Sequence, residues 1–256
     1  MVYYEFSHPD DLEATLRDAP VAYVPLGTYE HHGWHLPVGF DGIKAHALCR
    51  RAAEQTGGVV FPTFFYGTGG GHVSYKWTAI LDEPLIRPLL AATLDRLARF
   101  GFRVVVLLTG HYPPEQVQMV HSLAEEAAGR HPGTRFIGLT EAEIMTALPG
   151  DDYPGDHAAK YETSVALALA PEWVRLERLT PGRDPALVTL PDTLRRDGSP
   201  YDPSDALYAI WGDDPRMTAT MEIGQTLVKE ITGRLVERVS HELREVTGDE
   251  SGAATV

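Results

Sequence analysis

The stretch Val104-Val-Val-Leu-Leu-Thr109, followed by Gly110, contains five consecutive aliphatic residues. A short apolar run that ends at a turn residue is typical of a strand buried on both faces of a parallel sheet. The stretch Val21-Ala-Tyr-Val-Pro-Leu26, followed by Gly27, repeats the pattern. Both stretches therefore predict buried strands, and we expect them to lie in one sheet.

Helical and strand-like segments alternate along the rest of the chain. Further strands are expected at 59–62 and 134–139, and helices at 41–55, 84–100, 115–128, 162–170 and 217–246. Alternation of this kind predicts an α/β fold with three layers, α/β/α, around a mostly parallel central sheet. We expect one domain over residues 1–247, a long loop excursion over 180–215 and a flexible C-terminal tail over 248–256.

The composition excludes several classes of protein. Of the 256 residues, 43% are hydrophobic and 23% charged, the balance of a globular protein rather than a disordered or fibrous one. Lys and Arg number 22 against 36 Asp and Glu, so the net charge is −14 and a nucleic-acid partner is disfavoured. Cys49 is the single cysteine, which excludes an intramolecular disulfide. A signal-peptide pattern and a membrane-spanning apolar run are both lacking, so we expect a cytoplasmic protein without a membrane partner.

Candidate chemistry follows the first predicted strand, where sites form in open parallel sheets. Glu30 and His32 are two residues apart, so in extended chain they point to the same side. Asp41 comes at the start of the next helix and could turn back toward them. Oxygen and nitrogen ligands of this kind suit zinc, manganese or iron. A surface cluster of histidines explains the same stretch equally well.

Three further stretches carry candidate residues. His111 follows the strongest predicted strand, Asp156 and His157 could form a proton-transfer pair, and Glu162 opens a predicted helix. Each also has an ordinary explanation: a packed loop histidine, turn residues, and a carboxylate that compensates the helix dipole.

Taken together, these stretches resemble the creatininase family of metal-dependent hydrolases. The resemblance covers about residues 21–233 and rests on Pro25-Leu-Gly-Thr-Tyr-Glu30-His-His32-Gly-Trp-His35-Leu-Pro37 with Asp41, on Gly110-His111, on His157 followed by Glu162-Thr-Ser164, and on 216–224. It implies a layered α/β/α fold, a hexamer or other homo-oligomer, and two divalent metal ions, Zn²⁺ or Mn²⁺ with Fe²⁺ as an option.

The resemblance also implies roles for individual residues. Glu30 and His111 would bind one metal, His32 the other, and Asp41 would bridge them. Pro113 stands where creatininase itself has an acidic ligand, so Glu162 is the candidate for the remaining ligand. His157 matches the family's active-site histidine, and Asp156 precedes it as a second catalytic residue.

The implied reaction is hydrolysis of an amide or amidine C–N bond in a small non-peptide molecule, with a cyclic one expected, by a metal-activated hydroxide. His157, oriented by Asp156, would protonate the leaving nitrogen. Hydrolysis of a peptide C-terminus or of a formamide, and a non-catalytic metal-binding scaffold, are the alternatives.

Candidate substrate-binding residues are aromatic or histidine side chains near these motifs: Trp34, His35, His72, Trp77 and Tyr153. Packing in the core is an equally good explanation of the tryptophans and the tyrosine. The glycine-rich stretch 67–72 lacks the spacing of a dinucleotide or phosphate loop, and it predicts a flexible loop at the active site.

Overall fold

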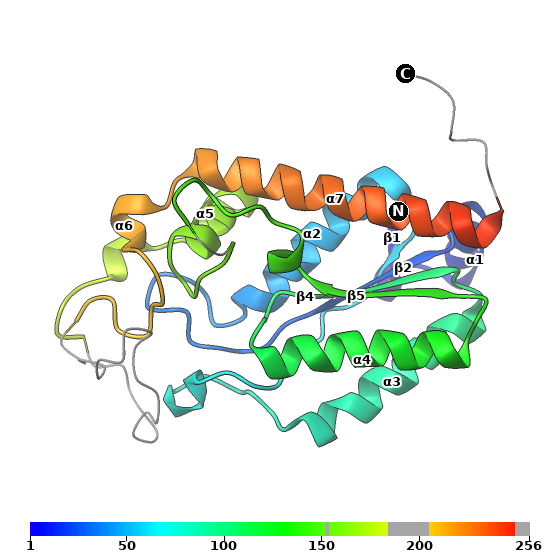
Figure 1. Cartoon of the computed structure of the whole chain (residues 1–256), viewed down its shortest axis with the longest axis horizontal. Coiled ribbons are helices and arrows are strands. Elements are labelled where there is room, and N and C mark those ends of the chain that lie inside the picture. Colours follow the sequence, from blue (N-terminus) through cyan, green and yellow to red (C-terminus); the bar gives the residue numbers. More distant parts are fainter. Residues whose placement is uncertain (152–153, 184–204, 249–256) are drawn as a thin grey trace.

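A computed structural model of the chain describes residues 1–151, 154–183 and 205–248. Five strands form one sheet in the order β1-β3-β2-β4-β5, and every pairing is parallel (Figure 1). The strands are β1 (Val2–Tyr3), β2 (Val21–Leu26), β3 (Val59–Val60), β4 (Val104–Thr109) and β5 (Arg135–Thr140).

Helices cover both faces of this sheet. They are α1 (Pro9–Asp18), α2 (Phe40–Thr56), α3 (Glu83–Phe100), α4 (Pro114–Arg130), α5 (Lys160–Leu169), α6 (Pro215–Thr218) and α7 (Met221–Thr247). In Figure 1, α2, α5 and α7 lie above the sheet, whereas α3 and α4 lie below it. The predicted three-layer α/β/α fold is therefore confirmed.

The alternation of side chains along β2 explains the two layers. Val21 and Tyr23 point into a core shared with α2 and α7, whereas Ala22 and Val24 point into a core shared with α3 and α4. All six residues of β2 are buried. A strand that is apolar on both faces is stable only between two layers of helices.

The structure differs from the sequence-based expectation at the two ends of the chain. β1 and α1 were not predicted: β1 has only two residues, and none of the ten residues of α1 is buried. The helix expected at 217–246 is broken after Thr218, and α7 begins beyond Thr220, whose hydroxyl accepts a hydrogen bond from the amide of Ile223. Most of the expected loop at 180–215, and the tail from 249, fall outside the described residues.

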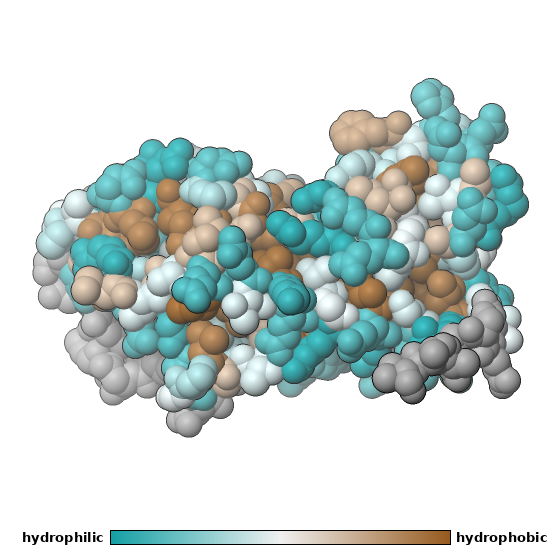
Figure 2. All heavy atoms as spheres, turned by 90° about the horizontal axis from the view of Figure 1, so that it is seen from above, coloured by the Kyte–Doolittle hydropathy of each residue, from teal (hydrophilic) through white to brown (hydrophobic). Residues whose placement is uncertain are grey.

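The surface seen from the α7 side mixes hydrophilic residues with smaller apolar patches (Figure 2). This mixture is expected where amphipathic helices turn one face to solvent. Within the described residues, no helix combines the length and the apolar character that crossing a membrane requires.

Candidate metal centre

The carboxyl ends of the two central strands are level. Leu26 of β2 pairs with Thr109 of β4, and a glycine follows each of them. A Cβ on Gly27 would lie 2.2 Å from the amide nitrogen of Gly42, and one on Gly110 would lie 2.2 Å from the carbonyl oxygen of Asp41. The first turn of α2 therefore rests directly on both strand ends, which only glycine allows.

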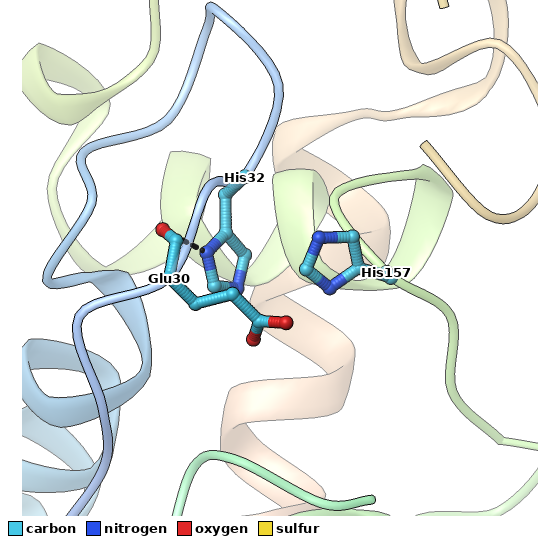
Figure 3. A group of neighbouring side chains, drawn as sticks. All are labelled: Glu30, His32 and His157. Carbon is cyan, nitrogen blue, oxygen red and sulfur yellow. Dashed lines mark hydrogen bonds between the residues drawn. The ribbon is translucent and has the colours of Figure 1, made fainter. Parts of the chain in front are cut away.

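The loop between β2 and α2 carries two of the predicted ligands. The amide of Glu30 donates to the carbonyl of Val38, which closes the loop. The His32 Nδ1 atom lies 3.0 Å from the backbone carbonyl oxygen of Glu30, as the dashed line in Figure 3 shows. This contact assigns the ring proton to Nδ1 and leaves Nε2 as the ligand atom, the usual way in which a metal-binding histidine is oriented.

A first group of donor atoms comes from three elements. His111 Nδ1 lies 3.0 Å from Glu30 Oε2 and 3.2 Å from Asp41 Oδ2. All three side chains are at most 4% exposed. Together they offer two carboxylate oxygens and one imidazole nitrogen at one point.

A second group shares Asp41 with the first. His32 Nε2 lies 3.0 Å from Asp41 Oδ1 and 3.6 Å from Glu162 Oε2, and these side chains are also buried. The ligand atoms within each group lie within 4.8 Å of one another. All five predicted metal ligands thus meet at one place, although they are spread over some 130 positions of sequence.

Orphaned polar atoms test whether these residues suit a metal. Among the described residues, His32 Nε2 and Asp41 Oδ2 are buried, and although each lies within 3.2 Å of an oppositely charged group, neither contact has the geometry of a hydrogen bond. A buried donor or acceptor without a partner is costly, and a metal ion would satisfy both atoms. Nitrogen and carboxylate ligands in two adjoining triads fit two divalent ions of the Zn²⁺ or Mn²⁺ type.

The charges of the two groups are mutually stabilising. Burial opposes protonation of His32, but the carboxylates of Asp41 and Glu162 outweigh it and raise its pKa to about 9. Burial likewise opposes protonation of His111, and Glu30 and Asp41 raise its pKa to about 10. Without a metal, both rings are therefore in the protonated imidazolium form at neutral pH. A bound metal ion would take the place of the second proton on each ring.

Two further histidines form one wall beside the ligands. The ring of His157 is stacked on that of His72 with centroids 4.2 Å apart, and it lies 4.5 Å from the ring of His32. His72 Nδ1 is 2.6 Å from Glu30 Oε1, and His157 Nε2 is 2.9 Å from the carbonyl oxygen of His31. In Figure 3 the carboxylate of Glu30 points toward the space between His32 and His157.

A cavity of about 720 Å³ opens over this cluster. Glu30, Asp41, His111 and Glu162 line it, as do His72, Asp156 and His157. Its walls also include Gly70 and Gly71, from the glycine-rich stretch expected at the active site. Five further lining residues were not singled out in the sequence: Tyr112, Pro114, Glu115, Gly155 and Trp211. Tyr112 is the residue after His111 and Glu115 the fourth after it, so their closeness to His111 in the sequence was a usable signal. Trp211, in contrast, is 100 residues beyond His111 in the chain.

Asp156 makes a different contact from the one expected. Its carboxylate accepts hydrogen bonds from the amides of Tyr161 and Glu162, at 2.6 and 3.2 Å. It therefore caps the first turn of α5 and fixes the helix that carries Glu162. The ring of His157 is held by the carbonyl of His31 instead.

Three predicted substrate-binding residues lie outside the lining of the cavity. His35 is buried, and its Nε2 atom lies 2.8 Å from the Thr163 hydroxyl, which ties the ligand loop to α5. The ring of Trp34 packs against the guanidinium of Arg183. Trp77 is 69% exposed. Tyr153 lies outside the described residues, so its predicted role has no structural counterpart.

These features are those of a hydrolase that uses metal-binding carboxylates and histidines at the edge of a parallel sheet. A family model named Creatininase, described as creatinine amidohydrolase, matches residues 6–239. The chain belongs to the creatininase family and is a creatininase-family amidohydrolase.

Individual relatives support this assignment. Creatinine amidohydrolase of Pseudomonas putida is 28% identical over 184 residues, 62% of this chain and 68% of that protein. Mycofactocin precursor peptide peptidase of Mycobacterium ulcerans (strain Agy99) is 30% identical over 232 residues, 86% of this chain and 85% of that protein. The crystal structure of creatinine amidohydrolase (creatininase) has a TM-score of 0.75 at 23% identity and covers 94% of this chain and 97% of that chain. Other solved creatininases include a Zn-Zn type and a Mn form, each with a TM-score of 0.74.

Proposed function

We propose that this protein is a dinuclear metal-dependent hydrolase of amide or amidine C–N bonds. Glu30, Asp41 and His111 would hold one divalent ion, and His32, Asp41 and Glu162 the other. The observation that carries this proposal is the sharing of Asp41, which offers one carboxylate oxygen to each triad.

The charge balance of the site supports two ions. Two dications bring +4, and Glu30, Asp41 and Glu162 bring −3. One anionic oxygen from water or substrate makes the cluster neutral, and a neutral cluster can be buried without a large solvation penalty. One dication alone would leave the three carboxylates in excess.

When bound, the metals would supply Lewis acidity that polarises the scissile carbonyl and lowers the pKa of a water molecule from about 15.7 to about 7. The chain's own residues would move the remaining proton. His157 Nε2 donates to the carbonyl of His31, so Nδ1 is the atom that accepts a proton and passes it to the leaving nitrogen. His72 would hold Glu30 in place through its 2.6 Å contact.

A small cyclic amide is the first candidate substrate. The C-terminal bond of a peptide is the second, and two observations favour it. A cavity of about 720 Å³ is far larger than a single small ring needs, since ligand pockets for drug-sized molecules start at about 300 Å³. The similarity to a peptide peptidase also extends over 86% of this chain.

Metal dependence of turnover tests the proposal. Protein stripped with a chelator should hold no metal and cleave neither creatinine nor peptides, and addition of Zn²⁺ or Mn²⁺ should restore cleavage of one of them. Mass spectrometry would detect ring opening of creatinine as the gain of one water molecule, and cleavage of a peptide as two fragments. Two metals per chain in the restored protein are expected. A restored protein that binds ions but cleaves no amide of either class would favour the non-catalytic scaffold.

The oligomer and the location of the protein extend the same proposal. We expect a homo-oligomer, a hexamer as in the family, and a cytoplasmic location. Light scattering of the purified protein measures the first of these directly.

A further inference from the structure

A fully buried lysine lies beneath the second metal triad. Lys44 is on α2, three residues after Asp41, and is 1% exposed. Its Nζ atom forms ion pairs with Glu141 Oε1 at 2.5 Å and with Glu162 Oε1 at 2.6 Å. Neither Lys44 nor Glu141 belongs to a motif that the sequence singled out, and no step of the proposed reaction uses them.

The ammonium group of Lys44 is buried and is surrounded by aromatic rings and carboxylates. The rings of Phe40 and Tyr112 each lie 5.0 Å from Nζ, so the ammonium group is enclosed by aromatic faces and two carboxylates. Removing a charge from water is costly, and only close counter-charges offset the cost. A buried ion pair of this kind can hold side chains in one geometry that hydrophobic packing alone would not specify.

The geometry that it fixes is that of Glu162. Lys44 occupies Oε1, whereas Oε2 accepts a hydrogen bond from the amide of Ala158 at 2.7 Å and lies 3.6 Å from His32 Nε2. The two oxygens of one carboxylate therefore have different partners. Only Oε2 faces the second metal triad.

We propose that Lys44 is a positioning residue that holds Glu162 as a one-oxygen ligand of the second metal, with Glu141 as its counter-charge. This inference rests on the proposed function, because it assumes that Glu162 is a ligand. It also explains how the second site is completed in a chain with Pro113 at the position of the family's acidic ligand: a carboxylate from α5 is held in place by a cation from α2.

The charges of the pair give a clean test. Lys44 and Glu141 sum to zero, so replacing both with neutral residues of similar length leaves the net charge around the metals unchanged. The double variant K44M/E141Q therefore removes the hold on Glu162 without altering the attraction of the site for a cation. Loss of an outer partner of a metal ligand typically weakens binding about 10- to 100-fold.

Chelator-stripped protein should be titrated with Zn²⁺ and with Mn²⁺, and both site affinities measured by calorimetry. In K44M/E141Q we expect the site of His32, Asp41 and Glu162 to lose about 10- to 100-fold in affinity while the site of Glu30, Asp41 and His111 is unchanged. The variant K44R, which keeps the charge and the donors, should retain both sites. Affinities equal to those of the wild type at both sites in K44M/E141Q would overturn the proposal.

A matched control lies on the same helix. R50M/E54Q removes an exposed ion pair between residues four apart on α2, likewise replacing the cation with Met and the Glu with Gln, and should leave both affinities unchanged. Thermal unfolding of each stripped variant shows whether it folds. If K44M/E141Q does not fold, K44Q/E141Q replaces it, because it removes the same charges and keeps a polar side chain near Glu162. The same loss of affinity is expected for it, and affinities equal to those of the wild type would again overturn the proposal.

The same titration separates this proposal from the one it rests on. A wild-type protein that binds only one ion contradicts the dinuclear site itself. A wild-type protein that binds two ions, with a double variant that binds them equally well, contradicts only the role of Lys44.

Discussion

The α-carbon of Gly110 lies against the backbone carbonyl of Asp41, so closely that a Cβ would sit 2.2 Å from its oxygen and 3.0 Å from its carbon. This contact joins the end of β4 to the first turn of α2. It sets the distance between His111, one residue after Gly110, and the carboxylate of Asp41. The metal site therefore depends on Gly110, which has no Cβ, as well as on the ligand residues.

Substitution of Gly110 by alanine should displace Asp41 and damage the site. Backbone atoms cannot move aside as a flexible side chain can, so we expect a loss of about 2 to 3 kcal/mol in the free energy of unfolding and weaker metal binding. Gly129, in the last turn of α4, is the control, since a Cβ there meets nothing within 4 Å. Its replacement by alanine should be neutral or stabilise by about 0.5 kcal/mol. Equal unfolding curves for the two variants would contradict the contact.

The ligand residues should differ in how many metals each controls. His32→Ala removes a ligand of one triad only, and His111→Ala a ligand of the other, so each variant should keep about one tightly bound ion. Asp41→Asn weakens both triads and should leave fewer than one. Elemental analysis with circular dichroism gives the count and checks the fold, and turnover should fall at least about 100-fold in all three. Unchanged metal content in Asp41→Asn would remove the bridging role.

Metal binding should release protons at neutral pH. The carboxylates raise the pKa of His32 to about 9 and that of His111 to about 10, so at pH 7 a metal ion must displace a proton from each ring. Each affinity should therefore rise about tenfold per pH unit between pH 6 and 8. Calorimetry at pH 7 in buffers of different ionisation enthalpy should show about one proton released per ion. Binding that is independent of the buffer would contradict the imidazolium–carboxylate pairing.

The same shifts predict how the metal-free protein responds to alkali. Because the pKa values of both rings are raised on folding, their contribution to stability is full below about pH 6.5 and is lost as the pH rises through 9 to 10. The thermal midpoint of chelator-stripped protein should therefore fall between pH 7 and pH 10, and His32→Ala should reduce that fall. An equal fall in the variant would assign it to other groups.

Trp77 should be replaceable without loss of activity. It has a backbone φ of 76°, in the left-handed region that favours glycine, and its side chain is 69% exposed and outside the cavity lining. Trp77→Gly relieves a strain of about 1 to 3 kcal/mol but adds freedom to the unfolded chain, so we expect a net gain of about 0.5 to 1 kcal/mol. The KM for substrate should not change. A raised KM would restore the substrate-binding role that the sequence suggested.

The position of each ligand relative to a strand or helix was readable from the sequence. The apolar runs of β2 and β4 are buried on both faces and can only be central strands, so residues that follow them must gather at one edge. Asp41 and Glu162 open helices, and a helix that follows such a strand begins at that edge. Local periodicity and the parallel topology thus brought Glu30, His32, Asp41, His111 and Glu162 to one neighbourhood.

Contacts between distant side chains were decided only by the tertiary structure. Lys44 has the pattern of any residue on a helix face, and nothing local reveals that it meets Glu141 and Glu162, 97 and 118 residues further along the chain. Trp211 enters the cavity because its backbone pairs with that of His157, and Asp156 turns to the amides of α5 rather than to the neighbouring ring. Periodicity fixes which face of an element is buried, whereas packing of whole elements fixes which atom meets which. The sequence therefore determined where the site lies, and the folded structure decided how its charges are paired.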